Sequence, residues 1–97
     1  MSAHHESHAV RAALAREIAQ TVSARGLTQC EAAQLLGTAQ PRVSALLNGT
    51  IEGFSLDRLV RYLNLLGEDI HIVVLPKPPE RACAHTWVSG PALGTEV

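Results

Sequence analysis

Two short amphipathic segments that meet at a glycine constrain the fold of this 97-residue chain most strongly. The first begins with Thr28-Gln29-Cys30-Glu31, which has the form of a capping box, and ends at Gly37. The second runs from Thr38 or Ala39 to Leu47 and is closed by Asn48-Gly49. Pro41 falls in its first turn, where a missing backbone N–H costs no intrahelical bond. The pattern therefore predicts two helices of about two turns each.

Four residues within these segments have the sizes and spacing that a close helix crossing needs. Ala33 is small enough to let the second helix approach the first. Gly37 can adopt the positive φ of a tight turn without steric cost. Val43 and Leu46 are three apart, so both can point from the second helix back onto the first. These positions together predict a helix-turn-helix unit.

Helices are also expected on both sides of this unit. From about Ser7 to Ala24, apolar residues recur every four positions and predict one buried stripe. A glycine at Gly26 suits the end of that helix. Ser55 can cap a further helix that stops at Gly67. The stripe of the first helix consists of Val10, Leu14, Ile18 and Val22, and the apolar face of the last consists of Leu56, Leu59, Val60, Leu63 and Leu66.

A β-branched run at residues 69–75 predicts a single strand that ends at Pro76. Both faces of this strand are largely apolar, and one isolated strand is not stable in water. We therefore expect it to pair with the same strand of a second subunit, antiparallel across a two-fold axis. The residues expected to form this dimer contact are Ile70, Ile72, Val73, Val74 and Leu75.

The two ends of the chain show little apolar periodicity. Residues 1–6 are expected to be a flexible N-terminus, residues 7–75 the folded domain, and residues 76–97 a disordered tail with four prolines. His4 and His8 are helically spaced, which leaves a metal-dependent sensor open as a minor alternative, although no complete ligand set accompanies them. Cys30 and Cys83 do not form a disulfide framework. We expect no cofactor and no metal.

Composition excludes several classes of protein. No apolar run approaches the roughly 20 residues of a membrane span, so we expect a cytoplasmic protein. The net charge is -1, below what a strongly basic nucleic-acid binder shows. Residues 1–67 carry six arginines against five acids, whereas residues 68–97 carry two cations against four acids. No phosphate loop, nucleophile triad or paired carboxylate is present in the sequence, so we do not expect an enzyme.

The stretches Leu27–Gly37, Gln40–Ser44 and Leu46–Gly49 resemble the lambda-repressor-like, or XRE-type, helix-turn-helix family. The continuation Gly53–Leu59 is similar to the HigA-type antitoxin subgroup. The resemblance covers about residues 10–75. It implies a mainly α domain of four to five helices, followed by a C-terminal β-strand that pairs in a dimer.

This resemblance implies that the chain binds double-stranded operator DNA. The second helix of the motif enters the major groove with its N-terminal residues toward the base edges. Ala45 departs from the family, because many relatives carry a longer polar or basic side chain there. The residues expected to contact bases are Thr38, Gln40, Pro41, Arg42 and Ala45, and those expected to contact phosphates are Gln29, Ser44, Asn48, Thr50 and Arg25.

The resemblance also implies a biological role. We expect a transcriptional regulator that represses its own operon as the antitoxin of a HigBA-like pair, with an RNase-like toxin as a candidate partner. The alternative is a protein-interaction module that neutralises a partner toxin and has weak or vestigial DNA binding. The low net charge and Ala45 favour this alternative.

Overall fold

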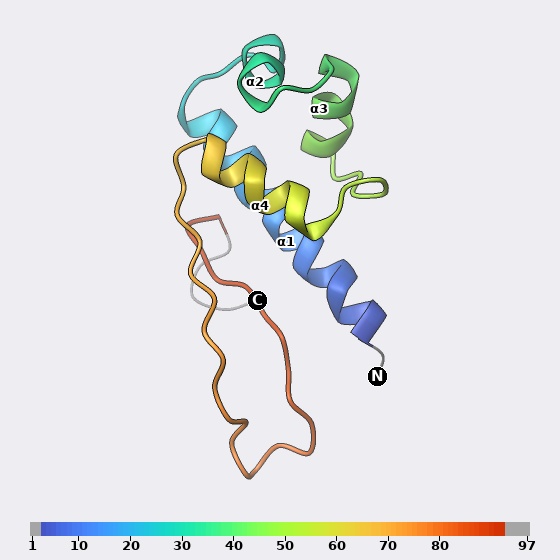
Figure 1. Ribbon diagram of the computed structural model, residues 1–97, viewed down its shortest axis with the longest axis vertical. Helices are drawn as coiled ribbons and strands as arrows, with labels where there is room; N and C mark the ends of the chain where they lie inside the picture. The colour runs from blue at the N-terminus through green and yellow to red at the C-terminus, as the bar shows by residue number, and fades with distance from the viewer. Residues whose placement is uncertain (1–2, 93–97) are drawn as a thin grey trace.

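The computed structural model describes residues 3–92, with side chains from Ser7 onward, and contains four helices. These are α1 (Ala3–Ala24), α2 (Gln29–Leu36), α3 (Gln40–Leu47) and α4 (Leu56–Leu65). The long α1 and α4 run alongside each other, and α2 and α3 lie across one end of that pair (Figure 1). The mainly α architecture is the predicted one, although α1 begins four residues before the expected start at Ser7.

The helix boundaries follow from local capping chemistry. The Thr28 hydroxyl accepts from the backbone N–H of Glu31 at 3.0 Å, and the Glu31 carboxylate accepts from the N–H of Thr28 at 2.8 Å. This capping box starts α2 as predicted. Ser55 likewise caps α4, accepting from the N–H of Arg58 at 3.1 Å. Each cap satisfies an N–H group that would otherwise have no partner in the first turn.

One core holds the helices together. The α1 stripe at Leu14, Ile18 and Val22 is buried, and Val10 packs against its edge. The core is largely aliphatic, as the sparse aromatics require, with Phe54 and Tyr62 edge to face at 6.4 Å between ring centroids. Its largest fully buried side chains are Ile18, Val43, Leu46, Leu59, Tyr62 and Leu66.

The chain after α4 differs from the sequence prediction. Residues 69–75 form no strand ladder in this single chain. After α4 the chain turns back and runs as an extended segment beside the helices, and it then continues beyond them (Figure 1). We call residues 70–75 the arm. A strand needs a neighbour to take its N–H and C=O bonds, and the arm has no such neighbour among residues 3–92. The pairing of this segment with a second subunit stays a prediction.

The segment after the arm turns and comes back to α1. The backbone N–H of Ala92 donates to the Glu17 carboxylate at 3.0 Å, although the two residues are 75 positions apart. A Cβ on Gly90 would lie 2.5 Å from that carboxylate, so a larger residue there would require the Glu17 side chain to shift. Val88 packs against the core cluster. The disorder expected for residues 76–97 remains a prediction, and residues 93–97 lie outside the described part.

Candidate nucleic-acid interface

The turn between α2 and α3 has the geometry that the sequence predicts. Gly37 adopts a left-handed conformation with φ of 70°. Its N–H donates to Gln34 at 3.3 Å, and the N–H of Thr38 donates to Ala33 at 3.0 Å. Ala33 is buried at the crossing, where Val43 from α3 is also buried. The orientation of α3 relative to α2 is therefore set by the turn and by direct packing.

The first turn of α3 presents most of the residues expected to contact bases. Gln40, Pro41 and Arg42 are all exposed there, whereas Thr38 and Ala45 are half-buried. Ala39 precedes the helix and has no side chain that could cap it. Gln40 makes no side-chain hydrogen bond to the rest of the chain among residues 7–92, so its amide can face a partner.

Arg42 is held by the loop between α3 and α4. Its Nη2 donates to the carbonyl oxygen of Gly53 at 3.2 Å, and its Cζ lies 4.3 Å from the centroid of the Phe54 ring. A cation stacked on an aromatic face is stabilised and loses rotamer freedom. We call this arrangement the Arg42 clamp. It fixes the guanidinium in one place and leaves donors that are not used by Gly53.

A second arginine, which the sequence interpretation did not single out, also bonds to this loop. Nη1 of Arg11 on α1 donates to the carbonyl oxygens of Ile51 and Phe54, both at 3.3 Å. The signal for this role was present in the sequence. Arg11 precedes Leu14 by three residues and Ile18 by seven, which places it on the buried face of α1.

The residues expected to contact phosphates divide into two groups. Gln29 opens α2 and Ser44 lies on α3, both half-buried, while Asn48 and Thr50 are exposed at the end of α3. Arg25 has a different environment, because its Nη1 donates to the carbonyl oxygen of Leu66 at 2.9 Å. This bond joins the end of α1 to the end of α4. The structure therefore gives Arg25 a structural partner within the chain.

The rest of residues 3–92 offers few competing sites. No helix there is long and apolar enough to cross a membrane. No cluster of three or more potential metal ligands is found in the same part of the chain. The side chains of His4 and His5 lie outside the described residues. Cys30 and Cys83 are both free and exposed.

Comparison with known proteins agrees with this geometry. The family model of a helix-turn-helix domain matches residues 1–75. A solved structure that carries the name XRE family transcriptional regulator is 39% identical, with a TM-score of 0.85 over 90% of this chain and 98% of that one. This chain belongs to the XRE-type helix-turn-helix family. No curated protein matches this XRE-type chain. In the helix-turn-helix fold, the second helix of the motif is the one that enters the major groove, and in this chain that helix is α3.

Proposed function

We propose that this XRE-type protein is a sequence-specific DNA-binding transcriptional regulator that acts as a cytoplasmic homodimer. The observation that carries the proposal is the exposed first turn of α3, held in a fixed orientation by the Gly37 turn and by the clamped loop. A helix presented in this way can enter the major groove. Regulators of this kind act by occupying an operator.

The exposed residues of α3 suit different parts of the DNA. The Gln40 amide can donate to and accept from one adenine at once. The clamped Arg42 can hold a phosphate or a guanine with its remaining donors. Ala45 offers only a methyl group, which suits contact with a thymine methyl. Thr38 and Pro41 complete the surface proposed to face the bases, and Gln29, Ser44, Asn48 and Thr50 surround it as proposed phosphate contacts.

The cation count favours a dimer. Three of the six arginines in residues 1–67, namely Arg11, Arg25 and Arg42, already donate to backbone carbonyls. The single lysine, Lys77, lies outside the helical body. Since phosphate neutralisation supplies most of the non-specific affinity, one copy should bind weakly. Two copies joined through residues 69–75 would each bind one half-site of the DNA, so the binding free energies of the two contacts would combine.

Replacing Gln40 by alanine tests direct base reading. With the DNA immediately upstream of the coding sequence as probe, we expect about tenfold weaker binding, because one bidentate base contact is lost. The penalty for changing one adenine in the site should fall to near zero in this variant. Fluorescence anisotropy against a series of single-base substitutions measures both effects.

Gln20→Ala is the matched control, because Gln20 is an exposed glutamine on α1. It should bind like the unchanged protein. Equal base preferences in Gln40→Ala and in the unchanged protein would show that Gln40 does not read a base.

We also propose that the regulator is the antitoxin of a HigBA-like pair and represses its own operon. Its acidic C-terminal third and its exposed Val73, Leu75 and Trp87 suit a basic RNase-like partner. Co-expression with the product of the neighbouring gene tests this role. Restored growth would support it, whereas toxicity that persists, or a harmless neighbour, would contradict it.

One observation favours the alternative of an interaction module with weak DNA binding. Because half of the arginines in residues 1–67 are occupied within the chain, few remain for phosphates. Under that alternative, Gln40→Ala would rescue growth as well as the unchanged protein does, and neither would prefer its own upstream DNA.

A further inference from the structure

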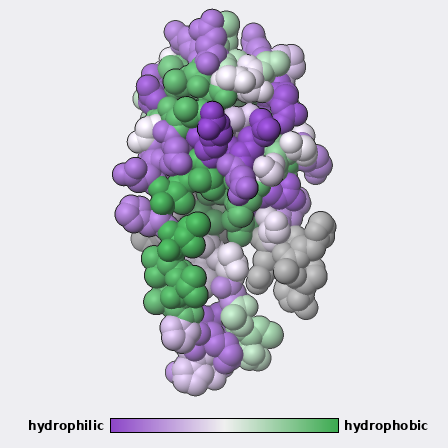
Figure 2. Space-filling view, viewed as in Figure 1, coloured by the Kyte–Doolittle hydropathy of each residue, from purple (hydrophilic) through white to green (hydrophobic). Residues whose placement is uncertain are grey.

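The arm exposes four consecutive large apolar side chains. Ile72, Val73, Val74 and Leu75 have relative exposures of 83%, 72%, 90% and 73%. These side chains form a continuous hydrophobic patch below the helical body (Figure 2). Contiguous apolar patches of this kind mark interaction sites.

Pairing with a second arm would not be enough to stabilise this segment. A two-stranded ribbon alone is only marginally stable in water, and it needs further strands or a helix to pack against. The proposed dimer ribbon therefore requires an apolar surface to pack against. This surface must lie beside the arm and must not be covered by the chain's own core.

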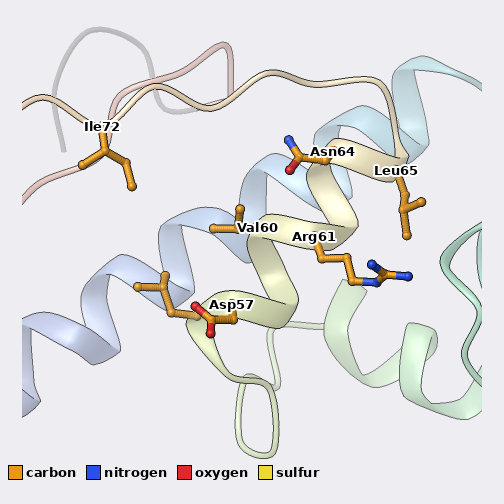
Figure 3. Close-up of a pocket in the computed structure, with 7 residues that line it drawn as sticks. Asp57, Val60, Arg61, Asn64, Leu65 and Ile72 are labelled. Carbon is orange, nitrogen blue, oxygen red and sulfur yellow. The ribbon is translucent and has the colours of Figure 1, made fainter.

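The outer face of α4 provides such a surface. An open groove of about 560 Å³ lies between α4 and the arm, with Leu56, Val60 and Leu65 on the helix side and Ile72 on the arm side (Figure 3). Leu56 is 43% exposed and Leu65 is 37% exposed, although both lie on a helix whose opposite face is core. The remaining lining side chains are the polar Asp57, Arg61 and Asn64. The groove therefore offers apolar contact area together with groups that can form hydrogen bonds, as protein interfaces do.

The described part of the chain, residues 3–92, does not fill this groove. Ile70, the first residue of the arm, is half-buried against the core, but Ile72 remains 83% exposed even though it lines the groove. The returning segment is held elsewhere, because the N–H of Ala92 donates to Glu17 on α1. Residues 3–92 therefore supply no strand that lies beside the arm and over α4, which leaves this position open to a second molecule.

We propose that the α4 groove receives the arm of a second copy of this chain. The inference rests on the proposed homodimer and specifies how that dimer is built. Each arm pairs antiparallel with the other and packs on the partner's α4, so the contact is the same in both directions. The shared arms link the two α4 helices, and this linkage fixes the distance between the two α3 helices. Half-sites about one helical turn apart, roughly 34 Å, are read by such a pair.

Leu56→Glu tests the groove. Leu56 is in the first turn of α4, where an acidic side chain favours the helix dipole, so the subunit should still fold. A charge in this apolar groove should raise the dimer dissociation constant roughly tenfold or more, measured by sedimentation equilibrium. Leu35→Glu is the matched control, because Leu35 is 38% exposed on α2 and lies outside the groove. It should leave the dissociation constant unchanged. An equally tight dimer in Leu56→Glu would overturn the proposal.

A second measurement needs no substitution. In a mixture of isotope-labelled and unlabelled full-length chains, we expect intermolecular nuclear Overhauser effects between methyl groups of Val60 and of the arm. Effects only within one chain, from the arm or from residues 88–92, would overturn the proposal. A dimer without these effects would leave the proposed DNA-binding function standing. A monomer that binds its upstream DNA specifically would overturn the groove and the homodimer but not the sequence-specific DNA binding. A dimer that shows these effects but has no DNA preference would overturn the proposed DNA binding and leave the groove standing.

Discussion

Arg42→Ala is expected to weaken binding to the protein's own upstream DNA by roughly 10- to 100-fold and to lower its melting temperature as well. The loss of affinity follows from the loss of one phosphate or guanine contact, worth about 1–3 kcal/mol. The thermal effect follows from the Arg42 clamp, because the variant loses both the bond to Gly53 and the stacking on Phe54. We expect a cost of about 1 kcal/mol, or roughly 4–8 °C in a domain of this size.

Anisotropy with single-base substitutions separates the two roles of this side chain. If Arg42 contacts a phosphate, the loss is uniform across DNA sequences and the salt dependence becomes shallower. If it reads a guanine, the preference at one position disappears. Arg42→Lys keeps the charge but not the planar stacking group, so it should recover only part of the affinity.

Arg58→Ala is the control, because Arg58 is an exposed arginine on α4 that is not placed at the interface. It should bind DNA nearly as tightly as the unchanged protein. An Arg42→Ala variant that binds its upstream DNA with full affinity would remove Arg42 from the DNA contact.

Leu59→Ala is expected to have the largest effect on stability. Leu59 has no exposed surface, and it lies on the α4 face that packs against the core. Removing most of a buried leucine side chain costs about 2–5 kcal/mol through lost transfer energy and the cavity that remains. Because a small domain has only about 5–15 kcal/mol in total, the melting temperature should fall by roughly 10 °C or more. Thermal and urea unfolding followed by circular dichroism measure the change.

The matched control is Leu35→Ala, because Leu35 is a partly exposed helical leucine. We expect a loss of less than about 1 kcal/mol there. Similar losses at the two positions would contradict the placement of Leu59 at the centre of the core.

The helices could be predicted from the sequence because their signals are local. The Thr28 capping box, the four-residue spacing through Ile18, and the left-handed Gly37 each depend on neighbours within one or two turns. The structure confirms these features and the burial of Val43 and Leu46. The exposed start of α3, including Gln40, follows directly from them.

The remaining features depend on contacts between distant parts of the chain. Arg42 and Arg11 donate to carbonyls 11 to 43 residues away. The spacing of Arg11 places it on the buried face of α1, but nothing in the sequence shows which carbonyl either arginine reaches. The bond between Glu17 and Ala92 spans 75 residues and joins a helix to a segment without regular structure. The predicted strand at residues 69–75 is a different case, because the pairing proposed for it is with a second chain.

The most direct test of sequence-specific DNA binding is fluorescence anisotropy of the full-length protein against two fragments over a salt series. One fragment is the DNA immediately upstream of the coding sequence, and the other is a scrambled fragment of the same length and composition. We predict a preference of roughly 100-fold or more for the upstream fragment, maintained as salt rises. Equal, weak and steeply salt-dependent binding to both fragments would contradict the account, because it would leave only the phosphate contribution.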